Sequence, residues 1–492
     1  MDASCGENDS VAPFFDPLHS LYHLFYEDHL AEPTGRGPVY GHVVSADLAH
    51  WARQPVAIWN DQPYDSSAIF TGSASLVNGI PTIIYPGICS KQAWPNCSTG
   101  VVNALAVPAN RSDPLLARWS KPSFNPIVEG AVKDPTAAWR TADGEWRYSD
   151  AAGRVLSSAD FVSWAPVGAV KGWGGDCSDF FELPPVCAGL PGCAPGANAT
   201  LPTHVFKNSG SGGISCPGAD CYWLGAYAEG APNTTGTWTP QPGVKAQPLD
   251  FTRGGYLYAS KSFWDPAKGR RVVFAWANVP PASCQTLPRV ATYHAGLNRL
   301  LLNPVEELVG LRGAALFSAP AVPLAGDLWL GDWAPGVGNQ TEVSLVFDLP
   351  AGGAGVFGLR VLAGRNASGA NVSTPVMLHW APSPPSLNVT VGGAPPLGLC
   401  DVPYGCTTAP VPLFEGEATM DVRVFVDNTF IEVFVGGGRL ALTAGVEAGA
   451  AAGAAGMALF GEATGATARN VSVWRMDSAW EEAADVLQRR AR

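Results

Sequence analysis

Hydrophobic and polar positions alternate in short runs along most of the chain. Examples are Val39–Ser45, Ile69–Leu76 and Val101–Val107, and Gly, Pro, Asn and Asp separate the runs. A period of two is typical of strands with one buried face, and the separating residues are typical of turns. Between Leu21 and about Arg312, no helix-length periodic segment interrupts this pattern. The pattern predicts an antiparallel all-β fold.

The length of the chain predicts more than one domain, because 492 residues exceed one ordinary hydrophobic core. Repeated Trp, Asp and Gly over residues 1–312 favour radial blades, and so a β-propeller over a single sandwich. The Ala- and Pro-rich residues 313–326 are predicted to be a linker. Strands resume over 327–480, which predicts a compact β-sandwich. Residues 481–492 are predicted to be a tail, and Ser478–Arg492 is predicted to form a short amphipathic tail helix.

Composition narrows the classes of partner. The net charge of −12 argues against nucleic acid and anionic membranes as partners. The sequence contains no apolar run of about 18 residues, so no membrane span is expected. Charged residues make up only 15% of the chain and there are 17 Trp, which suits a neutral polar ligand such as a sugar. The 8 histidines show no metal-ligand spacing, so no metal or other cofactor is expected.

The chain has 11 cysteines, and several are close in sequence. They lack the double-pair spacing of a zinc site, so disulfides that close short loops are predicted. The neighbouring cysteines are Cys89 and Cys97, Cys187 and Cys193, Cys216 and Cys221, and Cys400 and Cys406. An odd total leaves at least one free thiol, which we expect at Cys177.

Asn-x-Ser/Thr triplets, which accept N-glycans, are frequent. They begin at Asn8, Asn96, Asn110, Asn198, Asn233, Asn339, Asn366, Asn371, Asn388 and Asn470. Together with the paired cysteines they favour a secretory compartment. Met1–Cys5 lacks the apolar core of a signal peptide, so we expect the true N-terminus to be missing from this sequence. The alternative is a cytosolic protein whose triplets arise by chance.

Three Asp-containing turns in the first domain are candidates for chemistry. Asn8-Asp9 is predicted to form a turn before the aromatic strand Leu21–Tyr26. The others are Lys133-Asp134-Pro135 and the turn that contains Asp176. If each Asp lies on a different blade, a propeller would gather them at its axis. Glycoside hydrolysis needs such a set, because one carboxylate attacks or stabilises and another donates a proton. The alternative for Asp9 is an ordinary turn residue.

On these motifs the chain resembles glycoside hydrolase family 32, the invertases and fructan hydrolases. Asn8-Asp9 with Tyr22–Tyr26 resembles the family's Trp-Met-Asn-Asp-Pro-Asn-Gly motif and the strand that follows it. Lys133-Asp134-Pro135 resembles Arg-Asp-Pro, and Asp176–Phe180 resembles Glu-Cys-Pro-Asp-Phe. Further matches are Tyr40–Trp51, Phe70–Ser75, Tyr258–Phe263, Leu287–Arg289, Asn303–Leu308, Val424–Asn428 and Ile431–Phe434.

The resemblance implies an N-terminal five-bladed β-propeller followed by a C-terminal β-sandwich, in a secreted, cell-wall or vacuolar protein. It also implies hydrolysis of β-fructofuranosidic bonds in sucrose or fructans, with retention, through a covalent fructosyl-enzyme and without a cofactor. Asp9 is then the nucleophile, Asp134 the transition-state stabiliser, and Asp176 stands at the position of the acid/base Glu. The implied substrate-binding residues are Asn8, Glu27, Tyr40, Phe70, Ser73 and Lys133.

The sequence departs from the family pattern at the site itself. Ser10-Val11-Ala12 replaces Pro-Asn-Gly, Lys133 replaces Arg, Glu27 replaces Gln, and Tyr40 and Phe70 replace Trp. Asp176 is one methylene shorter than Glu, and a misplacement of about 1 Å costs on the order of a hundredfold in rate. Two hypotheses follow. The protein is a slow or respecialised glycosidase in which the backbone or Glu182 compensates, or it is a non-catalytic or weakly active sugar-binding or regulatory relative.

Other polar residues are interpreted structurally. We expect His23 to be a hydrogen-bonded core residue and Arg289 to brace a blade. Asp427 and Glu432 are interpreted as turn and strand-face residues of the sandwich. For Asp179, a substrate contact and a turn or salt-bridge role are equally compatible with the sequence.

Overall fold

The structure is a computed structural model. It describes residues 6–30, 37–187, 191–194, 200–210, 220–251, 257–279, 283–334, 336–365, 371–392, 408–446, 454–461 and 465–490. Almost all regular structure in these residues is β-strand, which confirms the predicted fold class.

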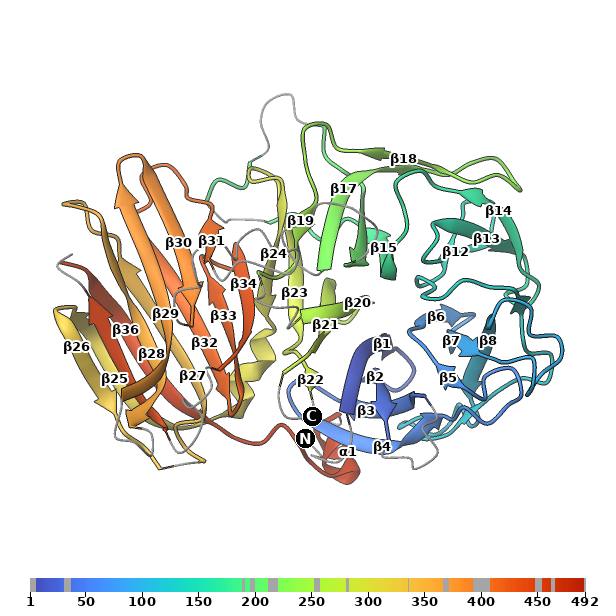
Figure 1. Ribbon diagram of the computed structural model, residues 1–492, viewed down its shortest axis with the longest axis horizontal. Helices are drawn as coiled ribbons and strands as arrows, with labels where there is room; N and C mark the ends of the chain where they lie inside the picture. The colour runs from blue at the N-terminus through green and yellow to red at the C-terminus, as the bar shows by residue number, and fades with distance from the viewer. Residues whose placement is uncertain are drawn as a thin grey trace.

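The N-terminal half forms five antiparallel sheets arranged in a ring (Figure 1). The first sheet contains β1 (Gly6–Asp16), β2 (Leu21–His29), β3 (Val39–Ser45) and β4 (Trp51–Ile58). The second contains β5 (Ala68–Ile69), β6 (Ser73–Val77), β7 (Ile80–Ile88), β8 (Val101–Pro108), β9 (Trp119–Ser120) and β10 (Val128–Glu129). The third contains β11 (Trp139–Arg140), β12 (Trp146–Ser149), β13 (Arg154–Ser158) and β14 (Ala165–Ala169).

The fourth sheet contains β15 (Asp176–Glu182), β16 (His204–Ser209), β17 (Asp220–Ala228), β18 (Thr237–Pro240) and β19 (Gln247–Pro248). The fifth contains β20 (Leu257–Asp265), β21 (Arg270–Ala277), β22 (Cys284–Gln285), β23 (Arg289–His294) and β24 (Arg299–Pro304). These sheets are the blades of a five-bladed β-propeller, as predicted.

The aromatic strand predicted at Leu21–Tyr26 is part of β2. It is buried on both faces because neighbouring blades cover it on either side. His23 stacks on Phe14, and its Nδ1 lies 3.0 Å from Nε2 of His42. The prediction that His23 is a hydrogen-bonded core residue is confirmed.

The prediction of a turn at Asn8-Asp9 was wrong, because both residues lie within β1. The pairing of β1 with β2 shifts register between Glu7 and Ser10, and again between Val11 and Phe14. Such β-bulges redirect side chains while the strand continues. Asn8 and Asp9 lie in the first of these bulges.

The C-terminal half forms two six-stranded sheets, which confirm the predicted sandwich. One contains, in spatial order, β25 (Arg312–Pro323), β36 (Thr467–Met476), β27 (Gln340–Asp348), β32 (Thr419–Asp427), β33 (Phe430–Val435) and β34 (Leu440–Gly445). The other contains β26 (Gly326–Gly331), β35 (Gly456–Gly461), β28 (Gly355–Arg365), β29 (Asn371–Pro382), β30 (Pro385–Val391) and β31 (Thr408–Val411).

The segment predicted as a linker, 313–326, belongs almost entirely to the sandwich. After the short 3-10 helix η1 (Glu306–Leu311), the chain enters β25, which pairs with β36. Pro residues are tolerated in β25 because it is an edge strand of its sheet.

The C-terminal tail returns from the sandwich to the first blade (Figure 1). The Trp51 N–H donates to the Ala479 carbonyl at 2.7 Å. The helix α1 (Ala483–Arg490) then places Val486 against Leu21 and Val44 of the blade. The predicted tail helix therefore forms, over a shorter span than Ser478–Arg492.

Two of the predicted disulfides, Cys89–Cys97 and Cys187–Cys193, are present. Cys221 is also disulfide-bonded. Cys216, Cys400 and Cys406 lie outside the described residues, as do the triplets at Asn198 and Asn366. Cys177 is free, as predicted, and Cys284 is a second free thiol.

A buried ion network joins the two domains. Arg289, on β23 of the propeller, forms ion pairs of 2.6 Å with Asp250 and with Glu432. Glu432 lies on β33 of the sandwich and is 1% exposed. Arg289 therefore braces an interface between domains, and Glu432 is a buried partner of that brace instead of the simple strand-face residue predicted.

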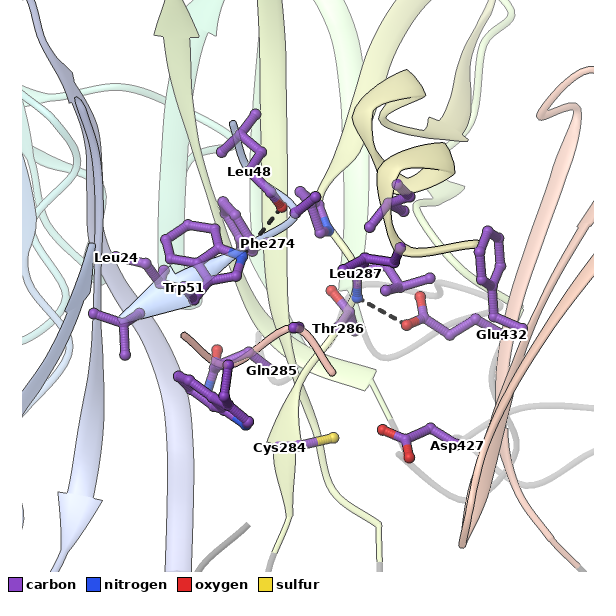
Figure 2. Close-up of a pocket in the computed structure, with 18 of the residues that line it drawn as sticks. Leu24, Leu48, Trp51, Phe274, Cys284, Gln285, Thr286, Leu287, Asp427 and Glu432 are labelled. Atoms are coloured by element: carbon purple, nitrogen blue, oxygen red, sulfur yellow. Dashed lines mark hydrogen bonds between the residues drawn. The ribbon is translucent and has the colours of Figure 1, made fainter. Parts of the chain in front are cut away.

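A cavity of about 230 Å³ lies beside this network, between the propeller, the sandwich and the tail. Figure 2 shows the Leu287 N–H donating to Glu432 on one side of it, with Cys284 and Asp427 lower in the same view. Its lining is mostly apolar and does not include Asp9, Asp134 or Asp176. The predicted carboxylates therefore belong to a different place in the molecule.

Candidate active site

The inner strands of three blades are irregular where they approach the propeller axis (Figure 1). Register shifts occur in β1 near Asp9, in β15 between Asp176 and Asp179, and in β20 between Tyr258 and Lys261. Asp134, on the loop before β11, has a positive φ of 61°. These local departures from regular strand take polar side chains out of the simple in–out alternation.

Cys177 brings the three predicted carboxylates together. Its backbone N–H donates to Oδ2 of Asp134 at 3.0 Å, and its thiol donates to Oδ2 of Asp9 at 3.2 Å. Asp176 is its neighbour in the chain. One residue of the fourth blade therefore contacts an acid from the first blade and an acid from the loop before the third.

Lys133 adds a positive charge to this cluster. Its ammonium lies 2.9 Å from Oδ1 of Asp176 and 3.8 Å from Oδ2 of Asp134. Tyr258 donates its hydroxyl to Oδ2 of Asp176 at 3.2 Å. The side chains of Lys133 and Asp176 are 41% and 26% exposed, so this side of the cluster is open to solvent.

Burial has the largest effect on the pKa values of the enclosed carboxyls in this cluster. It raises the pKa of Asp134 to about 6, against the opposing effects of the Cys177 N–H and of Lys133. Burial also raises the pKa of Asp9, although the hydrogen bonds from Thr71 and Cys177 oppose it. Acids of this kind retain protons at pH values where exposed carboxyls have lost them.

Glu27 joins the cluster through a hydroxyl group. It lies on β2 and is 5% exposed, and its Oε1 lies 3.1 Å from Oγ1 of Thr71. The same hydroxyl contacts Oδ2 of Asp9. Burial, followed by the charge of Asp9, raises the pKa of Glu27 well above its ordinary value.

No group of three or more His, Cys, Asp or Glu in the described part of the chain is arranged to hold a metal ion. In the same residues, no helix is long and apolar enough to span a bilayer. The groups present in the cluster are carboxylates, an ammonium and hydrogen-bond donors.

Family models account for most of the chain. The model "Glycosyl hydrolases family 32 N-terminal domain" matches residues 8–303, and "Glycosyl hydrolases family 32 C terminal" matches residues 329–475. The chain belongs to glycosyl hydrolase family 32. The resemblance inferred from the sequence motifs is thereby confirmed.

Curated members of family 32 align over nearly the whole chain. Acid beta-fructofuranosidase 2, vacuolar, from Rosa hybrid cultivar is 30% identical, and the alignment covers 96% of this chain and 80% of that protein. Beta-fructofuranosidase 1 from Zea mays is 30% identical, with 96% and 78% covered. The crystal structure of fructan 1-exohydrolase IIa from Cichorium intybus superposes with a TM-score of 0.73 at 23% identity and covers 98% of this chain and 100% of that one.

Two residues of this family 32 chain with implied substrate contacts are enclosed and hydrogen-bonded to backbone. Tyr40 has no exposed surface, and its hydroxyl donates to the Phe70 carbonyl at 2.6 Å. Ser73 is 4% exposed, and its hydroxyl donates to the Pro135 carbonyl at 2.7 Å. Both hydroxyls fix neighbouring backbone, and the substrate contacts implied for these two residues stay predictions.

Two of the other implied contacts lie nearer the surface. Phe70 is half-buried, and so is Asn8, whose carbonyl accepts a hydrogen bond of 2.8 Å from Gln285.

Glu182, considered as a substitute for the acid, is exposed at the far end of β15 from Asp176. Asp179 is 2% exposed and accepts the Ser262 N–H at 2.9 Å, which favours its structural role.

Sequence reasoning missed two buried lysines that hold the bulge of β15. Lys207 donates to the carbonyl of Cys177 at 3.1 Å, and Lys261 donates to the carbonyl of Ser178 at 2.7 Å. Both lysines are 2% exposed. A bulge leaves backbone carbonyls unpaired, and a buried ammonium satisfies them. In the sequence, each lysine stands within a predicted strand. A lysine there is equally compatible with a strand face exposed to solvent.

Proposed function

We propose that this family 32 chain hydrolyses β-fructofuranosidic bonds in sucrose or short fructans. The observation that carries the proposal is the convergence of Asp9, Asp134 and Asp176 around Cys177. The relatives named as beta-fructofuranosidases support the bond type. A variant of the Cichorium intybus exohydrolase, 25% identical to this chain, was crystallised in complex with 1-kestose, which supports a fructan as a second substrate class.

In this mechanism Asp9 attacks the anomeric carbon of the fructosyl unit. The bond to the leaving oxygen breaks, Asp176 gives its proton to that oxygen, and a covalent fructosyl-enzyme forms. Water then attacks the same carbon, returns a proton to Asp176 and releases Asp9. Thr71 and Cys177, which donate to Asp9, hold the attacking carboxylate in place. Asp134 hydrogen-bonds sugar hydroxyls in the transition state.

We propose a secretory destination, in the vacuole or outside the cell. The closed disulfides Cys89–Cys97 and Cys187–Cys193 suit an oxidising compartment. Triplet asparagines at Asn96, Asn110 and Asn233 are exposed and able to accept glycans. A relative named as vacuolar supports the same destination.

The proposed hydrolysis is tested by incubating purified protein with sucrose and with 1-kestose and measuring released fructose. We expect release from at least one of the two sugars, and its loss in Asp9→Asn. Glu415→Gln, on an exposed turn of the sandwich, is the control and should retain activity. No release of fructose from either sugar would contradict the proposal.

One observation favours a second function. Asp176 replaces the longer Glu of the family, and both its oxygens are engaged, by Lys133 and by Tyr258. A site with this acid drawn back would bind sugar with little turnover. Binding of sucrose in calorimetry without fructose release would select this sugar-binding alternative.

A further inference from the structure

One hydroxyl group links two carboxyls in the site. Oγ1 of Thr71 contacts Oδ2 of Asp9 and lies 3.1 Å from Oε1 of Glu27. A threonine hydroxyl supplies one hydrogen atom, so two ionised carboxylates would have to share it in a weaker three-centre bond. A proton on one of the two carboxyls gives each contact a hydrogen atom of its own. Either Asp9 or Glu27 is neutral in this arrangement.

The surroundings assign the proton to Glu27. Asp9 also accepts the thiol of Cys177, which favours its ionised form. Glu27 is 5% exposed, and the ion pairs of Lys133 are made with Asp134 and Asp176 instead.

On balance, the charged groups that face Glu27 disfavour its ionisation. Asp9 on β1 and Asp134 on the loop before β11 disfavour its ionisation, and Lys133 opposes them. Tyr40 on β3 is a buried phenol whose hydroxyl donates to the Phe70 carbonyl, so it adds no charge beside Glu27. Burial itself has the largest effect on Glu27.

We propose that Glu27 is a positioning residue, which keeps its proton and donates it to Thr71, so that the Thr71 hydroxyl donates to the ionised Asp9. The inference rests on the proposed role of Asp9 as nucleophile. Gln, which the family pattern has at this position, would donate an N–H to Thr71 without titrating. Glu27 makes the same arrangement sensitive to pH, because its ionisation leaves two carboxylates competing for one hydroxyl proton.

The kinetic test is the pH profile of sucrose hydrolysis in wild type, Glu27→Gln, Thr71→Val and Thr71→Ser. We expect Glu27→Gln to move the alkaline limb of kcat to higher pH. Thr71→Val should lower kcat by about tenfold or more with a smaller change in KM, and Thr71→Ser should restore it. The exposed variant Glu415→Gln is the control, with a wild-type profile. An alkaline limb that stays in place in Glu27→Gln would overturn the proposal.

A stability measurement tests the proton on Glu27 even if no sugar is hydrolysed. Burial raises the pKa of Glu27 above 4.5, so the folded protein holds a proton that the unfolded chain releases. Wild-type stability should therefore fall as pH rises above that value, whereas Glu27→Gln lacks this loss. The Tm of Glu27→Gln minus that of wild type should increase between about pH 5 and about pH 8. A difference independent of pH, as expected for Glu415→Gln, would show that Glu27 holds no such proton.

Discussion

At the scale of single residues, the site depends on how far each carboxyl reaches. Asp176 stands where family 32 has Glu, and it contacts Lys133 and Tyr258. Because the shorter side chain ends closer to its own backbone, its carboxyl is drawn back from the position that a longer acid would occupy.

Asp176→Glu should therefore raise the rate of sucrose hydrolysis. The added methylene lets the carboxyl extend further, and moving a catalytic group by about 1 Å changes the rate by on the order of a hundredfold. The measurement is kcat/KM at several pH values. Asp176→Asn, which keeps the shape but cannot donate a carboxyl proton, is the matched control and should lose activity. A rate that is unchanged or lower in Asp176→Glu would contradict the acid role.

The sequence predicted Asp9, Asp134 and Asp176 as one group because each sits in a short motif whose order along the chain is recognisable. It could not predict that Tyr40 and Ser73 would be enclosed, since burial depends on backbone from distant segments: Phe70 for one, Pro135 for the other. The role of Thr71 could not be predicted for the same reason, because it depends on contacts with two carboxyls on other strands.

At the scale of elements, alternation predicted the strands but not their irregularities. A bulge adds one residue to a strand, and the hydrophobic pattern on either side remains that of a strand. Asn8-Asp9 was therefore predicted as a turn, although β1 continues through it. The edge strand β25 was predicted as a linker because its Ala and Pro content is typical of connections.

The tail helix α1 is an element whose attachment can be tested. Val486 is its fully buried residue, packed against the first blade. Val486→Asp should detach the helix, because burying an unpaired carboxylate costs at least about 2 kcal/mol. We expect rapid hydrogen exchange of the amides in Ala483–Arg490.

The exposed change Gln488→Asp is the control for this variant, and its helix should stay protected. Equal protection of the helix in Val486→Asp and Gln488→Asp would show that Val486 does not hold the tail.

At the scale of the whole molecule, the propeller and the sandwich share buried charges. Arg289 pairs with Asp250 of the propeller and with Glu432 of the sandwich, and all three are nearly inaccessible. Removing the Arg289 guanidinium would leave two buried carboxylates without their positively charged partner. The two domains are therefore expected to depend on each other for stability.

Arg289→Ala should lower the free energy of unfolding by about 3–5 kcal/mol, as for other broken buried ion pairs. Urea unfolding measures this loss and shows whether one transition splits into two. Arg475→Ala removes an exposed pair with Asp477 and should cost less than about 1 kcal/mol. Similar losses in both variants would mean that the buried network does not couple the domains.

In the proposed mechanism, the carboxylates gathered at the propeller axis cleave β-fructofuranosides with retention. The most direct test follows sucrose cleavage by NMR and identifies the anomer of fructose that appears first, in wild type and in Asp9→Asn. We expect β-fructofuranose first from the wild type and no cleavage by Asp9→Asn. Absence of fructose from the folded wild type, or initial release of the α-anomer, would contradict the proposed mechanism.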